Sequence, residues 1–134
     1  MAHYKATYLG ELRTSITHLK SGKEVITDAP IDNHGRGEAF SPTDLTSASL
    51  GSCMATIIGI FANKHEIILP KFHYEIEKVM ASNPRKIATI KIHFTFEENS
   101  LTKEEKTKLQ RAALSCPVAL SLHPDIKQEI TFAF

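Results

Sequence analysis

Two cysteines are the residues of this chain whose types and placement best suit redox chemistry. Cys53 lies in the long uncharged stretch 45–63, and Cys116 lies just before Pro117, where a second helical pattern restarts. Two thiols that are far apart in sequence can act as one redox unit if the fold brings them together. Pairing of Cys53 with Cys116 is therefore the first hypothesis about function.

The two thiols differ in the local charge that the sequence offers them. A reactive cysteine must be a thiolate, and a free thiol with a pKa of about 8.5 is mostly protonated at neutral pH. Ser115 is a candidate N-cap, so Cys116 would open a helix and benefit from its positive end. Cys53 lies well inside its predicted helix, beyond that benefit. Local helix physics therefore predicts that Cys116 is the more acidic thiol.

Two other roles for the cysteines follow from their chemistry. A structural role stays open, because free cysteine is among the most buried residue types and behaves as a small hydrophobe. Metal binding is not favoured, since the spacings from Cys53 to His65 and from Cys116 to His123 are not those of zinc ligands. We expect no metal site.

Asp44 also has two open roles. Residues 41–44 (Ser-Pro-Thr-Asp) form a capping-box pattern, with Ser41 as the N-cap and Asp44 at the third helical position. Alternatively, Asp44 orients an arginine against a thiol. Arg13, in a predicted strand with no evident need for a cation, and Arg36, in a Gly-rich loop where solvation is the default, are the candidate arginines.

The first part of the chain predicts short strands. Residues 4–8 and 12–18 alternate, Ser21-Gly22 predicts a hairpin turn, and a further strand follows at 23–27. The Pro- and Gly-containing stretch 28–38 predicts a loop.

A helix predicted from Ser41 to about Asn63 is the centre of the expected fold. Small residues recur along it at four-residue spacing (Ser47, Gly51, Ala55, Gly59). A glycine inside a helix costs about 1 kcal/mol relative to alanine, so two of them indicate close approach of another backbone. The opposite flank is apolar (Ile57, Ile60, Phe61), which is typical of a buried helix.

The remaining segments complete an α+β pattern. Alternation over 70–81 and 85–97 predicts a long antiparallel hairpin. A second capping box at 102–105 begins a helix to about Ser115, and residues 130–134 alternate in a final strand. We expect one domain, residues 1–134, with an antiparallel sheet packed on the long central helix. A second subunit would cover the other side of that helix, giving a homodimer.

Composition excludes several classes of partner. The chain has 134 residues, a net charge of +1 and a pI of about 7.8, so its charge favours neither nucleic acid nor a membrane surface. The stretch 45–63 contains too many hydroxyl residues and glycines for a lipid-facing span. The N-terminus has no apolar signal core, so we expect a cytoplasmic protein. In that compartment paired thiols are more often catalytic or redox-sensing than structural.

Two segments resemble the signatures of the OsmC/Ohr family, the osmotically inducible and organic hydroperoxide resistance proteins. They are residues 37–53, which contain Ala-Phe-Ser-Pro-Thr-Asp-Leu and Gly-Ser-Cys, and residues 115–119, Ser-Cys-Pro-Val-Ala. The resemblance covers nearly the whole chain. It implies an intertwined homodimer with thiol peroxidase activity and active sites at the subunit interface. It makes Cys53 the peroxidatic thiolate, which passes through a sulfenic acid, and Cys116 its resolving partner.

The resemblance also implies the rest of the site. Arg13 would activate Cys53, a lipoyl dithiol or small thiol would regenerate the enzyme, and no bound cofactor is needed. Phe40, Met54 and Ile57 would frame an apolar site for the hydroperoxide. The peroxidases carry a glutamate after the proline to hold the arginine, but here Thr43 follows Pro42 and Asp44 comes next. A ligand-binding dimer without catalysis and a redox sensor of the same fold are therefore the alternatives.

Overall fold

The computed structural model describes residues 1–134, which form two compact units, Met1–Thr46 and Ser47–Phe134. The first unit is a three-stranded antiparallel sheet of β1 (Tyr4–Gly10), β2 (Arg13–His18) and β3 (Glu24–Asp28), in that order. The turn between β2 and β3 closes with a hydrogen bond from the Gly22 amide to the His18 carbonyl. This confirms the predicted strands and hairpin turn.

One boundary in this unit differs from the sequence prediction. Asp28 was expected to begin a loop, but it is the last residue of β3 and pairs in register with Arg13 of β2. The short 3-10 helix η1 (Ile31–Asn33) follows within the stretch that was predicted as a loop. The Asp28 amide donates to the Phe40 carbonyl, 3.1 Å away, which draws the strand end and the segment before the first helix together.

The helix α1 (Pro42–Lys64) begins with the predicted capping box. The Asp44 amide donates to Ser41 Oγ at 3.1 Å, and the Ser41 amide donates to Asp44 Oδ2 at 3.0 Å. These two bonds satisfy backbone donors that have no partner within the helix itself. α1 is long and apolar enough to cross a membrane by length and composition alone, but this is a weak indication, since core helices of soluble proteins meet the same test.

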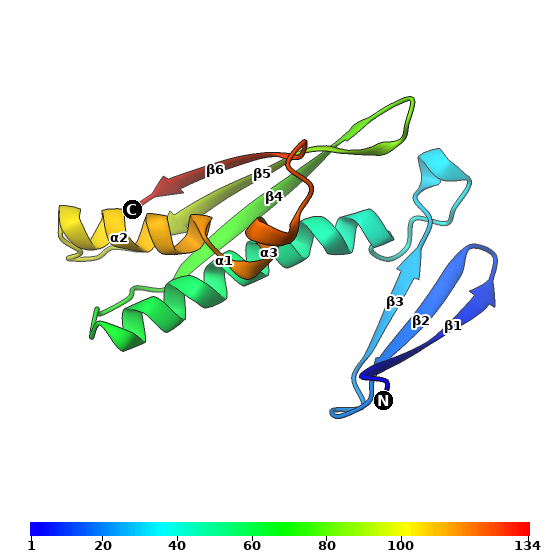
Figure 1. Ribbon diagram of the computed structural model, residues 1–134, viewed down its shortest axis with the longest axis horizontal. Helices are drawn as coiled ribbons and strands as arrows, with labels where there is room; N and C mark the ends of the chain where they lie inside the picture. The colour runs from blue at the N-terminus through cyan, green and yellow to red at the C-terminus, as the bar shows by residue number, and fades with distance from the viewer. The chain divides into compact units, whose positions relative to one another are not determined.

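The second unit packs helices against one face of a sheet (Figure 1). Its strands are β4 (Phe72–Ala81), β5 (Lys86–Phe96) and β6 (Lys127–Ala133), in the order β4-β5-β6. Its other helices are α2 (Lys103–Leu114) and α3 (Pro117–Ser121), which lie between β5 and β6 in the chain.

The predicted α+β architecture and the long hairpin are confirmed, with one difference in the sheet. β4 and β5 are antiparallel, but β6 runs parallel to β5. The reason is the connection: a parallel neighbour requires a crossover of a dozen or more residues, and here α2 and α3 supply it. Alternation in residues 130–134 predicted a strand but held no information on its direction.

The core of this unit lies where α1 meets β5 and α2. One row of α1 is buried at four-residue spacing, and inward residues of β5 and α2 pack against it (Leu50, Met54, Ile58, Ala62; Ile90, Ile92, Phe94; Leu109, Ala113). Aromatic rings stack across the strands beside this cluster, as in the pairs Phe72–Phe96 and Phe94–Phe132.

The small-residue row of α1 has a different neighbour from the predicted one. A Cβ atom on Gly51 would lie 2.6 Å from Cδ1 of Ile76 and 3.1 Å from Cε2 of Tyr74, so side chains of β4, not a backbone, occupy the space. A Cβ atom on Gly59 would have no atom within 4 Å. Ile60 is exposed in the single chain, so one flank of α1 is open.

These two glycines provide a matched pair of substitutions. We expect Gly59→Ala to raise the free energy of unfolding by about 1 kcal/mol, because alanine is the better helix former and the space is free. We expect Gly51→Ala to lower it by about 1 kcal/mol, because Ile76 and Tyr74 must move. Urea unfolding followed by circular dichroism measures both. Equal changes at the two positions would contradict this packing of α1 on β4.

Candidate redox site

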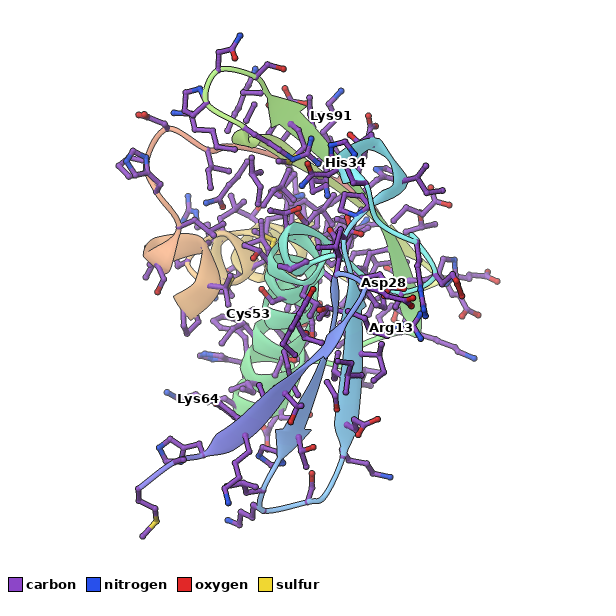
Figure 2. The ribbon with its side chains drawn as sticks, turned by 90° about the vertical axis from the view of Figure 1, so that its right-hand side faces the viewer. Arg13, Asp28, His34, Cys53, Lys64 and Lys91 are labelled. Carbon is purple, nitrogen blue, oxygen red and sulfur yellow. The ribbon has the colours of Figure 1, made fainter.

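The fold brings the two cysteines together within the second unit. Cys53 is in the middle of α1 (Figure 2), and Cys116 directly precedes α3. The thiols are free and interact through a side-chain hydrogen bond. Cys53 is partly exposed, whereas Cys116 is fully buried in the core cluster. The predicted spatial pairing of the two thiols is therefore present.

Burial decides the acidity of Cys116. Desolvation raises the pKa of its thiol, and the neighbouring Cys53 thiol raises it further. The backbone N–H groups of Ala119 and Val118 act in the opposite direction, but they do not outweigh burial. The prediction that Cys116 is an acidic thiol is therefore wrong. The helix that follows it has only five residues, and its end does not compensate for loss of solvent.

The cap at this junction is also different from the predicted one. Ser115 is the C-cap of α2, and its amide donates to the carbonyls of Ala112 and Ala113. Cys116 itself is the N-cap of α3, with its sulfur accepting a hydrogen bond from the Ala119 amide at 3.4 Å. The Cys116 sulfur therefore also caps the first turn of α3.

The three residues expected to frame the substrate are in different surroundings. Ile57 is one turn beyond Cys53 on α1 and is partly buried against the core. Met54 is completely buried in that core, where its side chain contributes to packing. Phe40, in the first unit, is exposed.

In the first unit, Arg13 and Asp28 form a bidentate ion pair (Figure 2). Arg13 Nε donates to Asp28 Oδ1 at 2.7 Å, and Arg13 Nη2 donates to Asp28 Oδ2 at 2.8 Å. Asp28 also accepts the Glu38 amide at 3.1 Å, and the Glu38 carboxylate lies 3.8 Å from Arg13 Nη2. The Asp28 side chain is fully buried, while 26% of the Arg13 side chain is exposed. The guanidinium is therefore fixed in place and still accessible.

This pairing shifts both protonation equilibria. The hydrogen bonds from Arg13 hold the pKa of Asp28 below its ordinary value, although burial acts against them. The same hydrogen bonds raise the pKa of Arg13. Both groups are charged at neutral pH, as a positioned cation requires.

The other predicted site residues have local partners. The Asp44 carboxylate accepts the Ser41 amide in the capping box, so its capping role is realised. Arg36 forms an ion pair with Glu11, and both side chains are largely exposed. No group of three or more His, Cys, Asp or Glu side chains is arranged to hold a metal ion.

Asp28 is the site residue that sequence reasoning missed. It was assigned to a loop, so its partner across the sheet was not considered. The signal was available in the hairpin turn: extending β3 by one residue places Asp28 directly opposite Arg13. An acidic residue opposite a lone arginine at adjacent strand ends is a cross-strand ion pair.

Comparison with known proteins bears on the family and the fold. Residues 35–131 match the family model described as OsmC-like protein. A solved structure from Psychrobacter arcticus 273-4, named as a candidate osmotic stress induced and detoxification response protein, is 50% identical, with a TM-score of 0.92 over 98% of this chain and 96% of that one. No curated protein matches the chain.

More distant structures share the fold. An organic hydroperoxide resistance protein OsmC from Legionella pneumophila is 18% identical, with a TM-score of 0.79 over 100% of this chain and 98% of that one. An organic hydroperoxide resistance protein from Elizabethkingia anophelis is 14% identical, with a TM-score of 0.76 over 99% and 96% of the two chains.

The Arg13–Asp28 pair generates a pH-dependent contribution to stability. Because the pKa of Asp28 is lowered in the fold, its contribution is complete above the unfolded pKa of about 3.9 and is lost as pH falls through the lower folded pKa. Below about pH 4, we expect the urea midpoint of Asp28→Asn to decrease less with falling pH than the midpoint of the wild type does. Glu38→Gln, with its exposed and more distant carboxylate, serves as the control. Identical acid profiles for Asp28→Asn and wild type would contradict the role of Asp28.

Proposed function

Because the chain belongs to the OsmC-like protein family, we propose that it reduces organic hydroperoxides through Cys53 and Cys116. The observation that carries this proposal is the contact between two free thiols, one partly exposed and one buried. A buried structural cysteine needs no second thiol against it. Organic hydroperoxide resistance is also the named property of two proteins that share this fold, those of Legionella pneumophila and Elizabethkingia anophelis.

The proposed cycle has three balanced steps. The Cys53 thiolate attacks the outer oxygen of the hydroperoxide, and the O–O bond breaks as Cys53 becomes a sulfenic acid. The departing alkoxide takes up a proton from water and leaves as the alcohol, which replaces the proton that Cys53 lost on forming the thiolate. The Cys116 thiol then displaces the hydroxyl group, which forms a Cys53–Cys116 disulfide and releases water. An external dithiol such as a lipoyl group, or two small thiols, reduces the disulfide by exchange and is itself oxidised.

The environments of the two sulfurs support this division of roles. Cys53 is partly exposed, so a substrate oxygen has access to it. Cys116 is fully buried and its pKa is raised, so it stays protonated at neutral pH and protected from direct attack by peroxide. When the sulfenic acid forms, the Cys116 sulfur attacks Cys53 as its proton passes to the departing hydroxyl group, so that water is released.

Activation of Cys53 is assigned to Arg13. A guanidinium beside a thiol favours the thiolate and stabilises the negative charge that develops on the peroxide oxygen. The bidentate contact with Asp28 supports this assignment, since it fixes the Arg13 guanidinium and leaves it partly exposed. In this chain Asp28 performs the holding function that Thr43 cannot, because a threonine hydroxyl carries no charge. Asp44 contributes by fixing the start of α1.

The proposed function includes a homodimer. One face of the first unit's sheet presents aromatic and aliphatic residues (Tyr4, Ala6, Tyr8, Ile16, Val25). In the single chain Tyr4 is 63% and Tyr8 is 64% exposed, whereas Ile16 is half-buried. Exposed apolar patches of this kind mark interaction surfaces. We assign this face to contact with a second copy, and the apolar hydroperoxide site to the dimer, with Phe40, Met54 and Ile57 around it. A cytoplasmic location fits the need for a thiol reductant.

A redox sensor is the second candidate function. It would form the same disulfide after a slow reaction and would show no sustained turnover. The observation that favours it is the position of the Cys116 sulfur at the start of α3, where its oxidation would affect the backbone.

Stopped-flow mixing with tert-butyl hydroperoxide, with alcohol formation as the readout, tests the proposal. We expect Cys53→Ser to slow the reaction by roughly 100-fold or more, because serine is not a comparable nucleophile at neutral pH. Arg13→Ala should slow it more than Arg13→Lys, which keeps the charge. Cys116→Ser should still consume one equivalent of peroxide but should not turn over with a dithiol.

Two results would contradict the proposal. An unchanged rate in Cys53→Ser would remove the peroxidatic role from that thiol. Peroxide oxidation of wild type without turnover in dihydrolipoamide or small thiols would replace the peroxidase with the sensor.

A further inference from the structure

We propose that the oxidation state of Cys116 controls the order of α3, because the sulfur that would bond to Cys53 is also the cap of this helix. The inference rests on the disulfide step of the proposed function. It assigns a conformational consequence to that step.

The N-cap of α3 is the sulfur of Cys116. Pro117, the first helical residue, has no N–H group. The next two residues supply the only donors of the first turn, and both interact with the Cys116 sulfur: the Ala119 amide at 3.4 Å and the Val118 amide beside it. The backbone of Cys116 is extended, with φ −66° and ψ 152°, as an N-cap requires. Both donors would lose their acceptor if this sulfur moved.

Disulfide formation changes the position of this sulfur. The two sulfurs must close from a non-bonded contact to about 2.05 Å, with a torsion near 90° about the new bond. The Cys116 sulfur therefore moves toward α1, away from the Ala119 and Val118 amides.

The other contacts of α3 are limited: Val118 and Ala119 are partly buried against the core. The helix has five residues, none of them fully buried, and Leu120 is 75% exposed in the single chain. One side-chain tether is present, from Gln128 Nε2 on β6 to the Ala119 carbonyl at 3.1 Å. Segments with few buried contacts open at low free-energy cost, so loss of the cap should be visible there first. Because Gln128 acts on a carbonyl, it does not replace the lost acceptor.

Amide hydrogen exchange measured residue by residue by NMR on the full-length protein tests this inference. The reduced protein is compared with protein oxidised by diamide, which takes up the two thiol hydrogens as the disulfide forms, so that no peroxidase activity is needed. We expect the Val118 and Ala119 amides to exchange about fivefold faster after oxidation, which corresponds to loss of a typical helix cap. Amides of α2, such as that of Leu109, should not change and serve as the internal reference.

A matched variant separates capping from oxidation. Cys116→Ser keeps a good N-cap oxygen but cannot form the disulfide, so its Val118 and Ala119 amides should stay protected with or without diamide. A disulfide that forms, by intact mass, without faster exchange of these amides overturns this inference alone. Failure of diamide to join Cys53 to Cys116 overturns both this inference and the disulfide cycle. Faster exchange with diamide but no reaction with hydroperoxide supports the inference and rejects the peroxidase proposal.

Discussion

The Cys116 sulfur is the point on which the candidate site depends. It packs in the core with α1 and α2, accepts the first-turn amides of α3, and contacts the Cys53 thiol. Burial in the core and the Cys53 thiol raise its pKa, although the α3 amides act in the opposite direction, and the packing protects the sulfur from solvent. Because the same sulfur caps α3, its oxidation would also affect that helix. A side chain with these constraints is suited to resolve an oxidised neighbour, and unsuited to attack a substrate from solvent.

In the first unit, one ion pair fixes the position of the arginine side chain. The Arg13–Asp28 pair joins two adjacent strand ends, and its bidentate geometry fixes the guanidinium more firmly than a single contact would. Asp44, the acid near the expected glutamate position, is instead part of the capping box of α1. The carboxylate that holds the arginine has thus been supplied by a different element. A departure from a family pattern at Thr43 therefore does not imply that the arginine lacks a partner.

Much of the fold was predictable from the sequence, and the failures have physical causes. Alternation and capping boxes located the hairpin, α1 and α2, because period and cap chemistry are local properties. The parallel pairing of β6 was not predictable, since direction depends on the crossover and not on alternation. The prediction that Cys116 is the more acidic thiol failed for a similar reason: helix ends are visible in the sequence, whereas burial, which raises its pKa, is a property of the assembled core. Asp28 was missed because one residue of strand was read as loop.

The proposed function requires the two sulfurs to act as one redox unit. The most direct measurement is the stoichiometry of oxidation: the reduced protein is titrated with a limiting hydroperoxide, and free thiols, alcohol and intact mass are followed together. We expect two thiols to be lost per alcohol formed, the mass to decrease by two hydrogens, and digestion to release a disulfide-linked Cys53–Cys116 peptide. Gain of oxygen at Cys53 with the Cys116 thiol still free would contradict the proposed function.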